Sequence, residues 1–153
     1  MDAYLDAEFS YRRFISVLGV YREDTGFHQL VGRKINPPNI AELFRGCHRV
    51  VTFNGTCCEI PMIRKWYGVD LKIAFESLDL FHFCRRRRIF GKMKEIEKLF
   101  GIERKVRLSG QGAMNLWYWY KRESDWFALQ KLLDYNREDV MNLKLLHERL
   151  CCV

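Results

Sequence analysis

The sequence predicts an α/β fold in which helices flank a mixed β-sheet. Short β-rich runs fill its first third, a strand-then-helix pattern follows, and helical periodicity dominates the last third. Segments in this order build layered α/β structures. With 153 residues, 48% of them hydrophobic, the chain is long enough for one compact domain and too short for two of ordinary size. We therefore expect a single domain over residues 1–153.

Three strands are predicted at the start of the chain. Residues 3–9 alternate apolar and polar side chains, which is the two-residue period of a strand. Two further β-rich runs, 15–21 and 27–31, are separated by turn-forming residues at 22–26. This order is typical of an antiparallel three-stranded meander.

The middle of the chain combines short helices with a strand. After a proline-containing interruption at 36–39, residues 40–44 predict a short helix and residues 49–53 a compact β-branched strand. Pro61 suits the first turn of a following helix, and Gly68 marks its end. This segment therefore supplies one more strand and two helices.

The remainder is mainly helical. Residues 73–83 fit neither period cleanly, and we assign them to a last strand, with a helix start as the alternative. Helices are expected over about 92–100 and 112–122. Asp125 then caps a long helix that continues to about Leu150.

The positive charge is concentrated in one segment. Residues 84–107 carry ten Lys or Arg against three Glu, so their charge of +7 equals the net charge of the whole chain. Such a patch is expected of a protein that binds a polyanion, most simply nucleic acid, although a solvated face has the same composition. The basic residues of this segment are Arg85, Arg86, Arg87, Arg88, Lys92, Lys94, Lys98, Arg104, Lys105 and Arg107.

The cysteines and the lengths of the apolar runs indicate the cellular compartment in which the protein is expected. The six cysteines include two adjacent pairs but no CxxC and no Cys/His spacing suited to zinc. Free thiols suit a reducing cytoplasm. No stretch approaches the roughly 18 to 20 uncharged apolar residues that a membrane span needs, and acids stand where a secretory signal would be basic and apolar. We therefore expect a soluble, cytoplasmic protein.

The first strand carries a pair of acids. Asp6 and Glu8 project from the same face, about 7 Å apart along the chain, and both can reach a shared pair of divalent ions. A polar face on an edge strand is the alternative. The neighbouring β-rich runs favour an inner strand, where acids are unusual.

The last helix carries another acid on its apolar side. At about 100° per residue, Asp139 falls inside an apolar arc about 140° wide, and Tyr135 lies one turn earlier at the edge of that arc. A buried carboxylate needs a cation, which is either a metal ion or an Arg or Lys from elsewhere. The apolar residues of the arc are Leu129, Leu132, Leu133, Val140, Leu143, Leu146 and Leu150.

A further acid, Glu59, lies where the strand at 49–53 turns into the helix that contains Pro61. It is a third candidate ligand. A carboxylate near a helix N-terminus is also favourable without any catalytic role.

Three motifs resemble those of the DEDDy 3′-to-5′ exonucleases in the ribonuclease H-like superfamily. Their order and spacing agree with that family, and the chain is most similar to the predicted exonuclease domains called YprB-like. Two further parts of this chain match the pattern of those domains. They are the Asp79-Leu80 pair and the Ser109-Gly110 pair, which precedes an aromatic helix. The motifs are Asp6-x-Glu8, Asn54-Gly55-x-x-x-Glu59-x-Pro61 and Tyr135-Asn136-x-x-Asp139.

The resemblance implies a ribonuclease H-like sheet, in which parallel strands join the antiparallel meander, and a two-metal hydrolysis of phosphodiester bonds in single-stranded DNA or RNA. Two Mg²⁺ or Mn²⁺ ions would be held by Asp6, Glu8, Glu59 and Asp139. Tyr135 would orient the attacking water.

The resemblance also implies how the strand is held. Asn54, Arg85 to Arg88 and Lys92 would contact the backbone of a single-stranded end without reading its sequence. Asp79 is a candidate to support the metal ligands, or is simply a residue at the end of a strand. A helicase or another nucleic-acid-processing protein would be a suitable partner.

The middle motif departs from the family. Members usually carry Phe-Asp where this chain has Cys58-Glu59, so the third carboxylate is one methylene longer. Two other functions therefore stay open. One is a nucleic-acid-binding module with a weakened or inactive nuclease site, and the other is a structure-specific endonuclease.

Overall fold

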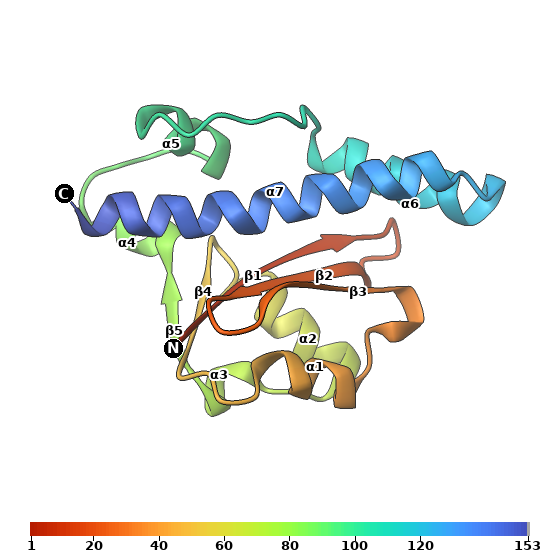
Figure 1. Cartoon of the computed structure of the whole chain (residues 1–153), viewed down its shortest axis with the longest axis horizontal. Helices are drawn as coiled ribbons and strands as arrows, with labels where there is room; N and C mark the ends of the chain where they lie inside the picture. The colour runs from red at the N-terminus through yellow and green to blue at the C-terminus, as the bar shows by residue number, and fades with distance from the viewer. Residues whose placement is uncertain (153) are drawn as a thin grey trace.

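The computed structural model describes residues 1–152 and contains a five-stranded mixed sheet in the order β3-β2-β1-β4-β5 (Figure 1). The first three strands pair antiparallel as a meander, whereas β4 pairs parallel with both β1 and β5. The predicted fold class is therefore confirmed. The strands are β1 (Asp2–Phe9), β2 (Ile15–Arg22), β3 (Gly26–Val31), β4 (Arg49–Thr52) and β5 (Glu76–Asp79).

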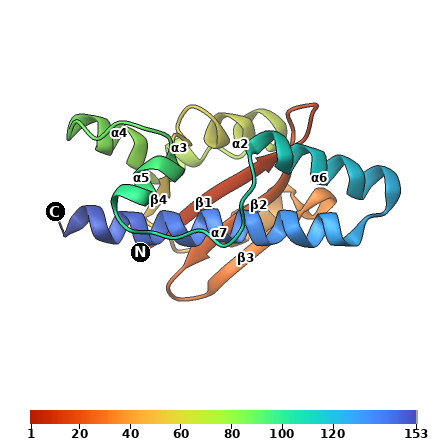
Figure 2. The ribbon, with the colours of Figure 1, turned by 90° about the horizontal axis from the view of Figure 1, so that it is seen from above.

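Helices cover both faces of this sheet (Figures 1 and 2). One face packs against α1 (Pro37–Phe44), α2 (Glu59–Tyr67) and α3 (Leu71–Ala74), and a 3-10 turn, η1 (Gly32–Lys34), precedes them. The opposite face packs against α7 and its neighbours. These are α4 (Leu80–Arg86), α5 (Met93–Leu99), α6 (Gly110–Glu123) and α7 (Trp126–Cys151).

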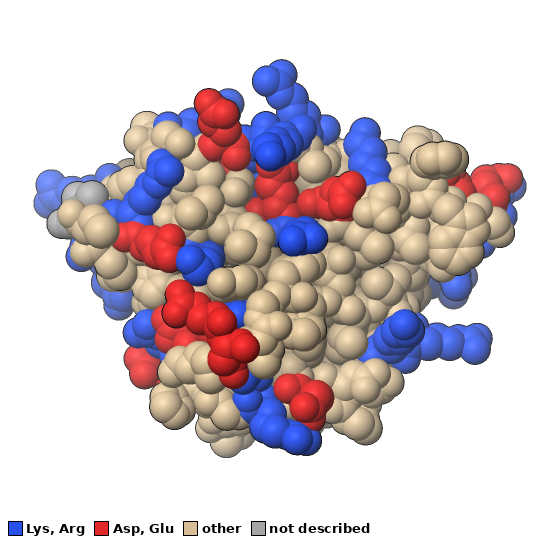
Figure 3. Space-filling model, in the orientation of Figure 1, with Lys and Arg blue, Asp and Glu red and all other residues tan. Residues whose placement is uncertain are grey.

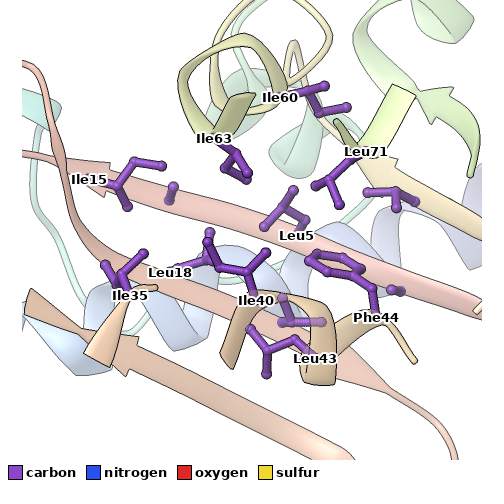
Figure 4. Packing of buried hydrophobic residues seen from close by; sticks show 14 of the residues in the cluster. Leu5, Ile15, Leu18, Ile35, Ile40, Leu43, Phe44, Ile60, Ile63 and Leu71 are labelled. Carbon is purple, nitrogen blue, oxygen red and sulfur yellow. The ribbon is translucent and has the colours of Figure 1, made fainter. Parts of the chain in front are cut away.

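The alternation of β1 separates an apolar layer from the acids. Leu5 and Ala7 point into the core beneath α1 and α2, where Phe44 and Ile63 are almost completely buried (Figure 4). Asp6 and Glu8, which alternate with them on β1, face the other side of the sheet, toward α7. Because β1 is the central strand, the acids on that side lie under a helix rather than in solvent.

The long helix α7 crosses the sheet with its apolar arc inward, as its periodicity predicts. Leu132, Val140 and Leu146 have no exposed surface. Gly19 on β2 makes the close crossing possible, because a Cβ there would lie 2.2 Å from the Asn136 side-chain oxygen of α7. Although α7 has 26 residues, neither it nor any other described helix is both long and apolar enough to cross a membrane.

Two predicted boundaries are wrong. The strand assigned to 73–83 is divided among α3, β5 and α4, because Asp70 caps α3 and Asp79 ends the strand by capping α4 through the Phe81 N–H. The helix expected at 40–44 begins earlier, at Pro37, because the Asn36 side chain caps it.

Candidate active site

Three carboxylates meet between the sheet and α7. Asp6 and Glu8 come from the central strand and Asp139 from the middle of the helix, and one oxygen from each lies within 4.8 Å of the others. Glu8 and Asp139 are buried, with 7% and 8% of their surface exposed. The sequence therefore predicted three acids that the fold does bring together.

A hydrogen-bonded scaffold fixes the relation of helix to strand. The Asn136 side chain, which is completely buried, donates from Nδ2 to the backbone oxygen and to Oδ2 of Asp6, each at 3.2 Å. Its Oδ1 accepts a hydrogen bond from Gln29 Nε2 at 2.9 Å. Because Asn136 joins α7 to β1 and β3, this side chain and the close approach at Gly19 contribute to the register of Asp139 over the two strand acids.

The acids have unused bonding capacity. Among residues 1–152, Glu8 Oε1 and Glu59 Oε2 are buried without a hydrogen-bond partner, whereas Asp139 Oδ1 lies in ion-pair contact with Arg104. Burial and the neighbouring charge of Asp139 raise the pKa of Glu8 to about 8, and burial and the same charge also raise the pKa of Asp6. Oxygen-rich clusters of this kind suit hard divalent cations such as Mg²⁺ or Mn²⁺. The residues present therefore fit a metal site.

Glu59 lies next to this cluster rather than within it. It is the first residue of α2 and is buried, and burial raises its pKa to about 7. Its charge contributes to the raised pKa values of Asp6 and Glu8, so it faces the same region. Glu59 therefore lies both at the start of a helix and beside the other acids.

Asp79 supports the loop that leads to Glu59. Its oxygens accept hydrogen bonds from the Asn54 N–H at 2.7 Å and from the Thr56 N–H and hydroxyl at 3.1 and 2.6 Å. Asn54 has a positive φ of 63°, and a Cβ at Gly55 would lie 2.5 Å from the Thr52 side chain. This tight turn explains the Asn-Gly pair.

Two cations from the basic segment face the acids. Arg104 Nη1 lies 2.5 Å from Asp139 Oδ1, in ion-pair contact but without the alignment of a hydrogen bond, and its other nitrogens donate to both oxygens of Glu97 at 2.5 and 2.7 Å. Lys94 Nζ donates to the Tyr135 hydroxyl at 3.0 Å. Asp139 thus contacts an Arg, the alternative considered for it, while it also shares the cluster with Asp6.

Tyr135 is placed where its hydroxyl can act beside the acids. It is buried on α7 one turn before Asp139, and burial followed by the charges of Asp139, Glu8 and Asp6 raises its pKa, so it stays protonated. Because Lys94 donates to the hydroxyl oxygen, the Tyr135 proton is free to be donated to a water or a phosphate.

The remaining predicted contacts lie on the surface. Arg85 to Arg88 are exposed, and Arg85 and Arg87 stack on aromatic rings of their own segment. Arg87 also donates to the carbonyl of Leu150, which is about 16 Å from Asp139 along the axis of α7. Lys92 is exposed at the start of α5. On the face in Figure 3, basic and acidic side chains are interspersed.

Sequence reasoning assigned no individual role to Lys94, Arg104, Gln29, Asn136 or Gly19. Lys94 and Arg104 were counted only as part of the basic segment, because a charge count does not show which cations point inward. A glycine within a strand pattern signals a close backbone approach, so Gly19 carried a readable signal, as did Asn136 through its place in the Tyr135-Asn136-x-x-Asp139 motif.

A carboxylate cluster between the central strand of a mixed sheet and a helix, in which Glu8 and Asp139 are buried, fits a divalent-cation site in an α/β protein. The model of the RNase H superfamily matches residues 3–151, and the chain belongs to that superfamily. Its fold is similar to part of the family B DNA polymerase from the hyperthermophilic archaeon Pyrobaculum calidifontis, with a TM-score of 0.78 and 15% identity. The match covers 98% of this chain and 24% of the polymerase. No curated protein sequence matches the chain.

Proposed function

We propose that this protein is a metal-dependent 3′-to-5′ exonuclease of the DEDDy type that hydrolyses single-stranded DNA or RNA ends. The observation that carries the proposal is the group of three carboxylates, with ligand oxygens within 4.8 Å of one another, of which Glu8 and Asp139 are buried and Asp6 is half-buried, beside a buried tyrosine. Membership of the RNase H superfamily supports it. Helicases produce single-stranded ends, so a helicase is the partner class that fits this activity.

Each residue has a part in this proposal. Asp6, Glu8 and Asp139 hold two Mg²⁺ or Mn²⁺ ions, and Glu59 adds negative charge at the edge of the site. When bound, such a pair of ions activates water and stabilises the departing oxygen. Tyr135 keeps its proton and orients the water.

Other residues hold the site in place or contact the strand. Asn136 keeps α7 in register with β1, and Asp79 keeps the Asn54 turn in place. Asn54 is half-buried and Arg85 to Arg88 are exposed, and in this proposal they contact the strand. Their contacts would be to the phosphate backbone, so the enzyme would not select a sequence.

A labelled-oligonucleotide assay tests the proposal. With Mn²⁺ or Mg²⁺, a 5′-labelled single strand should shorten stepwise from its 3′ end, while a circular strand should survive. Asp139→Asn should lower the rate by about 10³-fold, because the charge stabilisation lost at a metal site amounts to several kcal/mol. Asp134→Asn is the matched control, since Asp134 is exposed on the same helix. A cut circle would indicate an endonuclease, and equal rates for the two variants would exclude the site.

One observation favours a second function. The contact between Arg104 and Asp139 already supplies a positive charge to the cluster, which is what a binding module with a weakened nuclease site would need. That function predicts oligonucleotide binding without hydrolysis in either metal.

A further inference from the structure

An aromatic cavity lies just beyond the end of β1. It has a volume of about 650 Å³, is open to solvent, and is bordered by the β1–β2 turn, the end of α2, the start of η1 and α6. Figure 2 shows the β1–β2 turn between α2 and α6. The rings of Tyr11, Phe14, Trp66, Trp117 and Tyr118 line it.

These rings are held in place by one another. Phe14 meets Trp66 edge-on at 6.3 Å, and Tyr11 meets Tyr118 edge-on at 5.9 Å. Trp117 is buried, whereas Trp66 keeps 46% of its surface exposed and Phe14 keeps 36%. The cavity therefore has an ordered floor and accessible aromatic walls, which is what a flat aromatic ligand requires.

The charge of the cavity is of one sign. Arg12, Arg33 and Lys121 line it, and no acidic residue of the described chain does. Ser10 also lines it and is 5% exposed, and its buried hydroxyl oxygen lacks a hydrogen-bond partner among residues 1–152. An unpartnered buried hydroxyl beside three cations indicates a ligand with anionic oxygens.

The cavity and the carboxylate site are neighbours along the chain. Ser10, which lines the cavity, follows Glu8 by two residues, a separation of at most about 7 Å between their Cα atoms. A strand whose 3′ end lies at the acids can therefore place its next bases between α2 and α6.

We propose that this cavity binds bases of a single-stranded nucleic acid, with Arg12, Arg33 and Lys121 on the neighbouring phosphates. The inference rests on the proposed function for its choice of ligand. Stacking on aromatic rings tolerates any base, so the cavity would hold the strand without sequence preference.

Binding of a fluorescent twelve-residue oligothymidylate in EDTA tests the inference without requiring hydrolysis. Trp66→Leu should weaken binding by roughly 5- to 100-fold, the loss expected for one stacked base. Trp119→Leu is the matched control, because Trp119 is 48% exposed on α6 and does not line the cavity. A strand of abasic residues, which keeps the phosphates, should bind the wild-type protein more weakly than oligothymidylate.

Equal affinities for the Trp66→Leu and Trp119→Leu variants, or equal binding of the abasic and thymidylate strands, would overturn the inference while leaving the nuclease proposal intact. Conversely, a loss of binding in Trp66→Leu from a protein that hydrolyses no strand in Mn²⁺ or Mg²⁺ would support the cavity and reject the nuclease. The rise in melting temperature with Mn²⁺ should be the same in both variants, which checks that each is folded with an intact carboxylate site.

Discussion

The carboxylate cluster and the run from Arg85 to Arg88 are both concentrations of like charge, yet the fold treats them differently. The acids are brought together from a strand and a distant helix, Glu8 and Asp139 are buried, and Glu8 retains an oxygen without a partner. The arginines are adjacent in sequence and exposed, and two of them stack on nearby rings. Burial of unsatisfied charge, rather than the amount of charge, therefore indicates where chemistry takes place.

The sharpest test of this comparison replaces one arginine from each environment. Arg104→Gln should lower the unfolding free energy by about 3–5 kcal/mol, because it leaves Glu97, which has no exposed surface, as an unpaired buried charge. Arg86→Gln should change it by no more than about 0.5 kcal/mol, since Arg86 is exposed. Urea denaturation at pH 7 measures both, and similar losses would remove the distinction.

The effect of metal on stability at different pH values tests whether the carboxylate cluster binds divalent ions. Because the pKa of Glu8 is raised from 4.5 to about 8, the folded protein binds more protons than the unfolded chain between these values. This group therefore makes the metal-free protein less stable as pH rises through that window. Divalent ions bind the ionised acids, so their stabilising effect should grow with pH.

The expected difference in melting temperature between Mn²⁺ and EDTA is small at pH 5 and about 5–10 °C at pH 8, with metal at about 100 times its dissociation constant. Thermal unfolding of the wild-type protein and of Asp139→Asn provides the measurement. A shift in the variant as large as that of the wild-type protein would place the metal away from the cluster.

The same comparison shows how far the sequence could predict the fold and the site. Periodicity was sufficient for β1 and α7, because a central strand and a long amphipathic helix carry strong patterns, and so Asp6, Glu8 and Asp139 could be proposed to converge. Residues 73–83 could not be divided correctly, because three short elements follow one another there and only side-chain caps separate them. The contact of Arg104 with Asp139 could not be predicted, because Arg104 lies in a loop, where no sequence period shows which way a side chain points.

Glu59 lies between the two environments, since it is buried at a helix start beside the cluster. Glu59→Gln should lower hydrolysis about tenfold with either ion, less than Asp139→Asn, because the cluster of oxygens within 4.8 Å comprises the other three acids. Glu59→Asp, the residue usual in the resembling family, should raise the rate with Mg²⁺ relative to Mn²⁺, because Mg²⁺ tolerates a displaced ligand less well. Initial rates in each metal decide this, and rates that neither substitution changes would make Glu59 only a helix-start residue.

The smallest expected effect concerns the exposed arginines themselves. If Arg85 to Arg88 meet phosphates, replacing all four with Gln should weaken single-strand binding and reduce the slope of log affinity against log salt by about 0.7 for each phosphate that is no longer neutralised. The unfolding free energy should hardly change, because the four side chains are exposed. Replacing Lys34, Arg45, Lys72 and Lys131 with Gln removes the same charge from other exposed positions and controls for net charge. The affinities are measured between about 50 and 300 mM salt, a range over which phosphate binding weakens steeply. If the slope for the arginine variant equals that of this control, the arginine run is a solvated surface. The strand is then held by groups nearer the acids.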